Sequence, residues 1–212
     1  MSKISLEPNT SGAGTFTLAA PNSNTNRTLN LPDASGNIIA ADASTGQFDS
    51  SNMPAGSVLQ VQSTTKIDTA ITTSETFVDL PGMSVDITPF FSTSKILIIA
   101  DCMGGGNANR HTVDFRFRRD NNTIGVSNTS VVTPCSFGFI VHNSSTTPAG
   151  ASGSHLDTPS TTSPTTYSLQ WRCGNIGDTA VTEAYLNRVR AEQSSLDFPR
   201  YVSTITVMEI AA

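Results

Sequence analysis

The sequence predicts an all-β protein in which a short N-terminal β-arm precedes an antiparallel β-sandwich or jelly-roll-like domain. Only 14% of the 212 residues are charged, and Ser, Thr and Asn take the place of the missing charges. This composition, with few helix formers, favours β-structure over helix or disorder. From residue 57 onward, short runs of alternating apolar and polar residues are separated by turn residues, and about eight to ten such runs are typical of a sandwich.

The first 41 residues contain three short β-runs, Thr15–Ala20, Arg27–Leu31 and Asn37–Ala40, separated by turn-rich breaks. A two- or three-stranded piece of this size is marginal in water, so we expect it to need a partner surface. Residues 1–41 are therefore predicted to be a docking arm. Its predicted contact residues are the large apolar ones of the three runs: Phe16, Leu18, Leu29, Leu31, Ile38 and Ile39.

Residues 42–56 are small, polar and unpatterned, and they end in Pro-Ala-Gly, which is typical of a linker. The domain predicted over residues 57–212 begins with runs that contain Leu59, Val61 and Ile71. The stretch from Phe77 is expected to lead into a turn at Pro81-Gly82, after which residues 83–87 alternate again.

The run Lys95–Ala100 is apolar throughout, which is typical of a central strand covered on both faces, and Gly104–Gly106 is expected to end it. A hairpin is predicted through the turn at residues 120–122. Three alternating sets are predicted to face the core, and they are Val113, Phe115 and Phe117; Phe137, Phe139 and Val141; and Tyr167, Leu169, Trp171 and Cys173. Tyr201–Ile210 is predicted to be the last strand.

Two segments are harder to assign. Thr182–Gln193 contains helix formers and could be a short helix, but it also alternates, and we favour a strand because its neighbours are strands. Ser144–Pro164 is rich in Ser, Thr, Gly and Pro, and we predict a long loop outside the core.

The arm and the domain each resemble a known family. Gly14–Leu18, an Asn-rich turn, the stretch Arg27–Asp33 and the pair Ile38-Ile39 resemble the N-terminal segment of many small phage tail-fibre and virion-surface proteins. GSVLQVQ, FVDLPGMSVDITP with SKILI, LDTPSTTSPTTYSLQWR and the terminal STITVMEI, in this order, resemble a C-terminal β-domain of phage virion proteins. The resemblance implies a virion-surface structural protein that is a homotrimer, with the arm docking and trimerising.

Composition argues against several other classes. The net charge is −5 and no basic run of five or more residues occurs, so nucleic acid is not an expected partner. No apolar run approaches the roughly 18 residues of a membrane span, and no signal peptide opens the sequence. We therefore expect synthesis in the host cytoplasm and a location on the virion surface, without membrane insertion.

No chemistry is predicted from the titratable residues. Cys102, Cys135 and Cys173 are far apart and are expected to be buried free thiols, not metal ligands. The three His residues form no zinc or hydrolase motif. We expect no catalytic residue, no metal, no cofactor and no enzymatic activity.

A glycan site is the remaining ligand hypothesis. Trp171 is assigned to the core, and His142, His155 and Tyr185 are the candidate glycan contacts. The cluster Arg116, Arg118 and Arg119 is interpreted as the solvent face of a strand, with a phosphate or anionic-glycan site as the alternative.

Two functions fit this prediction. In the first, the chain is a capsid decoration or cement protein that binds the major capsid protein through its arm and displays the sandwich outward. In the alternative, it is a short tail fibre, attached to a tail or baseplate protein, that recognises a host surface glycan. A free lectin or a C1q- or TNF-like ligand is a third class, and it would need a secretion signal.

Overall fold

A computed structural model describes residues 11–15, 22, 24–26, 28, 53–106, 111–128, 134–141, 147–174, 183–191 and 198–212. The chain divides into two units, residues 1–38 and 39–212. In the first unit, the described residues are exposed to solvent. The three predicted β-runs of the arm and its six contact residues lie outside the described residues, except for scattered positions such as Thr15 and Thr28.

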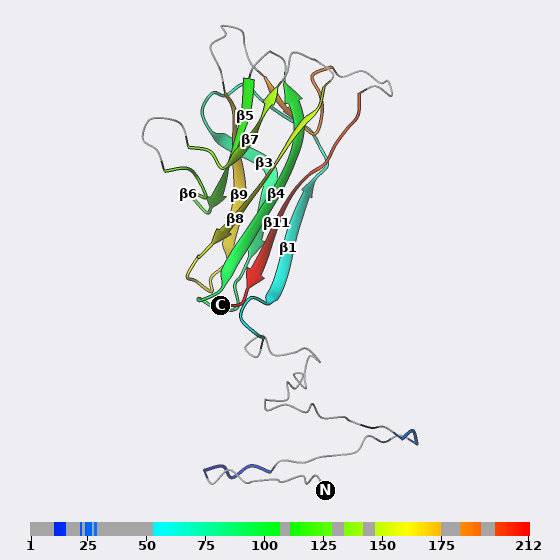
Figure 1. Cartoon of the computed structure of the whole chain (residues 1–212), viewed down its shortest axis with the longest axis vertical. Helices are drawn as coiled ribbons and strands as arrows, with labels where there is room; N and C mark the ends of the chain where they lie inside the picture. Colours follow the sequence, from blue (N-terminus) through cyan, green and yellow to red (C-terminus); the bar gives the residue numbers. More distant parts are fainter. Residues whose placement is uncertain are drawn as a thin grey trace. The chain divides into compact units, whose positions relative to one another are not determined.

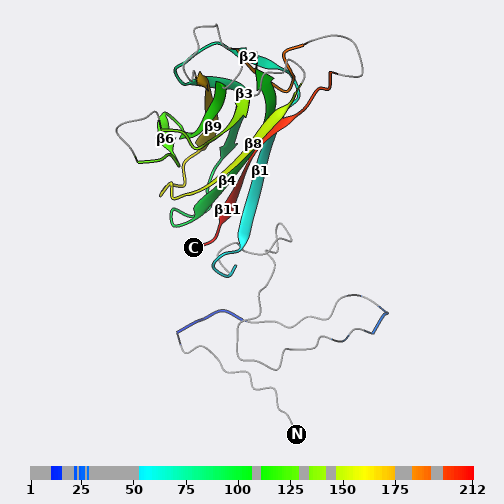
Figure 2. The same cartoon turned by 45° about the horizontal axis from the view of Figure 1, so that its top comes forward.

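The second unit is a sandwich of two antiparallel sheets, as the sequence predicts (Figures 1 and 2). No helix occurs among the described residues. The first sheet contains β1 (Val58–Lys66), β2 (Ala70–Thr72), β4 (Lys95–Gly106), β8 (Ala149–Asp157), β10 (Ala184–Leu186) and β11 (Ser203–Ile210). The second contains β3 (Val78–Ile87), β5 (His111–Arg119), β6 (Asn122–Ile124), β7 (Phe137–Val141) and β9 (Thr165–Gly174).

The long strand β4 organises the first sheet. One of its edges pairs with β8 along almost its whole length. Its other edge pairs first with β11, up to Asp101–Thr204, and then with β10, from Gly104–Leu186 onward. Because β1 pairs with β11 and β2 pairs with β10, the sheet is four strand positions wide, and two of these positions are interrupted.

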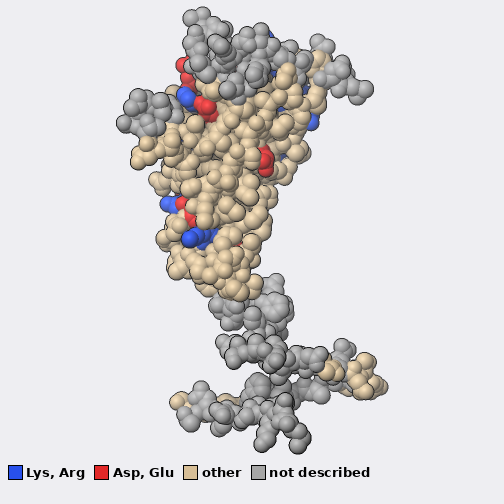
Figure 3. Space-filling view, in the orientation of Figure 1, with Lys and Arg blue, Asp and Glu red and all other residues tan. Residues whose placement is uncertain are grey.

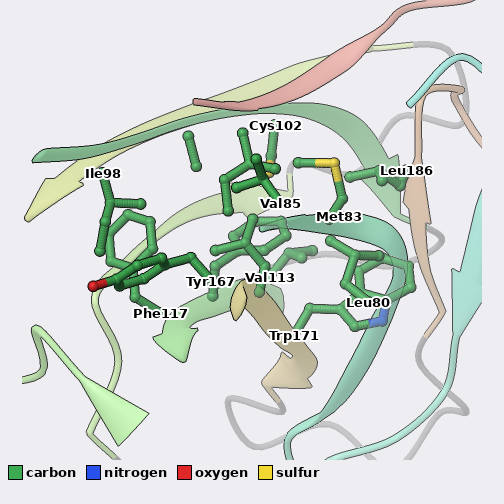
Figure 4. Close-up of a cluster of buried hydrophobic side chains, with 14 of the residues drawn as sticks. Leu80, Met83, Val85, Ile98, Cys102, Val113, Phe117, Tyr167, Trp171 and Leu186 are labelled. Atoms are coloured by element: carbon green, nitrogen blue, oxygen red, sulfur yellow. The ribbon is translucent and has the colours of Figure 1, made fainter. Parts of the chain in front are cut away.

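The core lies between the two sheets and is formed by the inward side chains of both (Figure 4). The predicted inward positions of β5 and β9 are confirmed, because each is at most 1% exposed. Trp171 belongs to the core, and the Phe115 ring stacks on it with centroids 6.5 Å apart. Opposite them, Ile96, Ile98, Ala100 and Cys102 of β4 are fully buried, so the predicted central strand is also confirmed on this face.

One predicted turn is wrong. Pro81-Gly82 lies within β3, where Leu80–Met83 bulge opposite Leu169 alone, between the pairs Asp79–Gln170 and Ser84–Ser168. β4 ends at Gly106, as predicted, but Gly104–Gly106 are paired strand residues and not a turn. A Cβ atom at Gly104 would lie 1.9 Å from the Tyr185 carbonyl oxygen, so glycine is required by close approach to β10 and not by a turn.

The predicted loop at Ser144–Pro164 is also wrong, because it contains strand β8. Small residues are needed there, since the strand packs closely on its neighbours. A Cβ atom at Gly153 would lie 2.2 Å from the Phe137 ring. In Thr182–Gln193 the preferred strand is confirmed over β10, which is only three residues long.

Asn187 joins the two interruptions of the first sheet. Its side chain is fully buried, and its Nδ2 donates to the carbonyl oxygens of Lys66, at 2.8 Å, and Asp68, at 2.9 Å, between β1 and β2. Its Oδ1 accepts from the Ser203 hydroxyl at 2.6 Å, at the start of β11, and its backbone NH donates to the Met103 carbonyl of β4 at 2.7 Å. Its φ of +60° is left-handed, a conformation that Asn tolerates better than most residues.

We predict that Asn187→Ala lowers the free energy of unfolding by about 3–5 kcal/mol. Unpaired buried carbonyls and hydroxyls cost about 1–3 kcal/mol each, and a left-handed alanine adds roughly 1 kcal/mol. Asn187→Gly should lower the free energy of unfolding by about 1 kcal/mol less than Asn187→Ala, because glycine loses the same hydrogen bonds but adopts the left-handed backbone without strain. Urea unfolding followed by the fluorescence of Trp171 measures both, with the exposed Asn122→Ala as control. A loss below about 1 kcal/mol for Asn187→Ala would contradict this role.

Candidate functional site

The outer face of strands β8, β4, β11 and β1 carries a row of aliphatic side chains. The strand registers align Leu156 with Leu97, Leu97 with Met208, and Met208 with Val61, so the row crosses all four strands. Val61 and Leu156, at its two ends, are 50% and 49% exposed. We call this surface the apolar face, and its aliphatic residues are Val58, Val61, Leu97, Ile99, Leu156, Met208 and Ile210.

The rest of the apolar face is almost free of charge. Beside the aliphatic row its outward side chains are hydroxyls: Ser63, Thr65, Ser152, Ser154, Thr204 and Thr206. Among its described positions on these strands, only Lys95 and Asp101 are charged. The view in Figure 3 shows correspondingly few charged atoms over the middle of the sandwich. Next to Gly150, where β8 has no side chain, a hollow of about 330 Å³ opens beside Asp101 and Met103.

The apolar face is incompletely covered. The sequence predicts that Lys95–Ala100 is covered on both faces, yet Leu97 and Ile99 on the outer side stay partly exposed. Apolar area removed from water is worth about 25 cal/mol per Å², and a contiguous exposed apolar patch marks an interaction site. The apolar face is therefore the candidate functional site. Sequence analysis identified the apolar run but not the row, because the row depends on which strands pair.

The outer face of β3, β9 and β5 has the opposite chemistry, and we call it the charged face. Arg172 pairs with Asp114 at 2.7 Å, and Arg116 donates to the Gln170 side-chain oxygen at 2.9 and 2.6 Å. Gln170 in turn donates to Asp79 at 2.6 Å. Asp114 and Gln170 are buried beneath this network, whereas Arg116 and Arg172 are half-buried and Asp79 is exposed, so the outer ends of the charged groups are in contact with water.

The predicted arginine cluster divides between the two sides of β5. Arg116 and Arg118 lie on the charged face, as predicted, and the Arg116 guanidinium lies 4.2 Å from the centre of the Phe77 ring. Arg119 instead reaches Asp157 of β8 at 2.8 Å, where the Tyr167 hydroxyl also donates. Burial, followed by the hydrogen bond to Asp157, raises the pKa of Tyr167. This group joins the edges of the two sheets.

The structure does not assemble the predicted glycan contacts. His142 lies outside the described residues. His155 is opposite Ile98 and Tyr185 is opposite Gly105, at distant points of β4. Tyr185 is only 5% exposed, so its predicted surface position is wrong. The Arg188 guanidinium lies 4.6 Å from the centre of the Tyr185 ring, and the Tyr185 hydroxyl donates to Glu183.

The prediction of buried free thiols is confirmed for two of the three cysteines. All three are free thiols; Cys102 and Cys173 are buried, and Cys135 is half-buried. Burial raises the pKa of Cys102, which keeps this thiol protonated and unreactive. Within the described ranges, no group of three His, Cys, Asp or Glu residues could hold a metal ion. Nor do those ranges contain a helix that is long and apolar enough to cross a membrane.

Comparisons with known proteins identify no family. No family model matches the chain, and no curated protein matches it. Among solved structures, it is similar to a chain in the structure of the infectious bursal disease virus Gx strain, with 13% sequence identity and a TM-score of 0.39. The match covers 83% of this chain and 43% of that chain, so this chain spans less than half of the viral one. Similarity at this level identifies no function.

The burial of Tyr185 predicts a dependence of stability on pH. Burial, followed by the hydrogen bond to Glu183, raises the pKa of Tyr185 to about 12, above the roughly 10 of an unfolded chain. The protonated phenol is favoured in the folded protein, so its contribution to stability is complete below pH ~10 and is lost toward pH ~12. We expect the urea midpoint to fall over this interval, and to fall less in Tyr185→Phe. Equal falls in the two proteins would refute this.

Proposed function

We propose that this chain is a structural protein of a bacteriophage particle, and specifically a capsid decoration protein. In this proposal, arm residues 1–41 bind the major capsid protein, and the sandwich is displayed outward as part of a homotrimer. The observation that carries the proposal is the combination of an arm-like sequence with a sandwich that has one apolar outer face with only two charged residues among its described positions. The role is mechanical and requires no catalytic residue, cofactor, nucleic acid or membrane.

The chemistry of the apolar face supports self-association. In a cyclic trimer, three copies of a face that is turned toward the threefold axis come close together and must not bring like charges together, and this face has only Lys95 and Asp101 among its aliphatic and hydroxyl side chains. The four strands contain 8 to 12 residues each, and a four-stranded area about nine residues long spans about 19 by 30 Å, or roughly 570 Å², from the usual spacings of a sheet. This is on the order of the ~800 Å² that each partner contributes to a standard interface.

A short tail fibre that recognises a host glycan is the second candidate. It is favoured by the resemblance of Gly14–Ile39 to tail-fibre arms. The two candidates differ in copy number on purified virions, measured by quantitative mass spectrometry against the major capsid protein. Hundreds of copies per particle would support decoration, whereas a few copies, in multiples of three, would support the tail fibre.

The docking role of the arm predicts the effect of two substitutions. Leu29→Asp combined with Leu31→Asp should abolish attachment to virions, because it places charge on the apolar side of the run Arg27–Leu31. Thr28→Asp combined with Asn30→Asp adds the same charge to the other side and should retain attachment. Co-sedimentation with depleted virions measures binding, and an unchanged thermal melt shows that residues 57–212 stay folded. Retained attachment of the leucine variant would disprove docking through these residues.

Self-association predicts the effect of a charge in the aliphatic row. Val61→Asp should raise the dissociation constant of the trimer at least about tenfold, or ~1.4 kcal/mol, because the carboxylate must be desolvated. Ile67→Asp is the matched control, since Ile67 is an exposed aliphatic residue (76%) outside the apolar face. Sedimentation equilibrium of the full chain measures the mass. A wild-type monomer at micromolar concentration, or a Val61→Asp trimer of unchanged stability, would count against this interface.

A further inference from the structure

A polar hollow of about 370 Å³ lies on the charged face, where β3 bulges away from β9. Among the residues that line it are Asp79, Pro81, Ser84, Arg118, Asp120 and Ser168. We propose that this polar hollow binds a neutral saccharide unit. The proposal does not depend on whether the protein is located on the capsid or the tail, nor on the apolar face.

The walls of the polar hollow are formed by two irregular backbone segments. On one side, the bulge Leu80–Met83 leaves the β3–β9 ladder, with Gly82 at a φ of +76°. On the other side, the turn between β5 and β6 places Asp120 at a φ of +50°. Asp120 is fixed there by its NH, which donates to the Thr166 carbonyl at 2.8 Å, and by its Oδ1, which accepts from the Thr166 NH at 3.0 Å. These bonds hold the wall of the polar hollow in place.

The polar hollow also contains hydrogen-bonding groups without a protein partner. Arg118 donates through Nη2 to the Asn121 carbonyl, but its buried Nε has no partner among the described residues. The hydroxyls of Ser84 and Ser168 likewise have no bond to the described part of the protein. The buried Nε of Arg118 has lost its contact with water without gaining a partner, so a ligand that supplies an acceptor there is favoured. The Nε of Arg116, two residues away, instead donates to Gln170, as does its Nη2.

The combination of groups selects the ligand class. Two carboxylates, of Asp79 and Asp120, outnumber the single cation of Arg118, which opposes phosphate, sulfate or a sugar acid. Sugar hydroxyls both donate and accept, so a neutral saccharide can pair with the carboxylates, the guanidinium and the serine hydroxyls together. The ring of Pro81 supplies an apolar surface for the C–H groups of a sugar. The volume lies at the lower end of the range for small-molecule sites, about 300–1,000 Å³.

The test uses saturation-transfer NMR and titration calorimetry of the full chain with a panel of neutral mono- and disaccharides and with sialyllactose. We expect a dissociation constant on the order of 1 mM or tighter for at least one neutral sugar. Arg118→Met should weaken it at least tenfold, whereas the matched control Arg116→Met should leave it within twofold. Ser84→Tyr, at an exposed position, fills the polar hollow without removing a core contact and should also abolish binding. Thermal melts confirm that each variant folds.

Three results would overturn the proposal. They are the absence of binding to every neutral sugar in the panel, binding that survives both Arg118→Met and Ser84→Tyr, and a preference for sialyllactose. Val61→Asp, on the apolar face, should bind the sugar as the wild type does. Failure of the trimer interface and failure of the saccharide site are therefore distinguishable.

Discussion

The sandwich depends on how the first sheet closes around Asn187. Two of its four strand positions are interrupted, one between β1 and β2 at residues 66–70 and the other between β10 and β11 at residues 187–203. The buried side-chain amide of Asn187 forms hydrogen bonds with residues at both interruptions, and its backbone NH donates to β4. The backbone turns away at the same residue, since φ is +60°. Without this bridge, the Lys66 carbonyl and the donating hydroxyl of Ser203 would each lose a buried hydrogen bond. The break lets the chain fold back over Tyr185, so that Arg188 covers its ring.

The two outer faces follow from the same alternation of side chains, yet they differ in chemistry. On the charged face, Arg116, Gln170 and Asp79 form a chain of hydrogen bonds that remains in contact with water. On the apolar face, Leu97 and Ile99 have only one another and their neighbours in the row. A strand covered on both faces is expected to be apolar throughout, and β4 has this sequence although the described chain covers only its inner side. The missing cover is what a second copy supplies in the proposed trimer.

The sequence predicted the features that follow from the two-residue alternation of a strand. It did not predict features that depend on contacts between segments far apart in the chain. Alternation identified the inward residues of β5 and β9, including Trp171, because burial on one face imposes period two. The sequence places Gly104 at a strand end and Gly153 in a loop, where glycine is frequent, but here each makes room for a neighbouring strand or ring. The aliphatic row, the bridge of Asn187 and the polar hollow depend on strand order and a bulge, which no local pattern contains.

The placement of the two proposed surfaces on opposite sheets has a consequence for binding. The outer faces of a two-sheet sandwich point in opposite directions, so a copy that packs through its apolar face keeps the polar hollow open to solvent. A trimer would then present three hollows at fixed separation. A single site with a millimolar dissociation constant binds a saccharide only weakly. When several such sites are linked on one particle, binding at one site raises the effective concentration of the saccharide surface at the others. Self-association through one sheet would thus strengthen weak saccharide binding at the other, without any contact between the two sites.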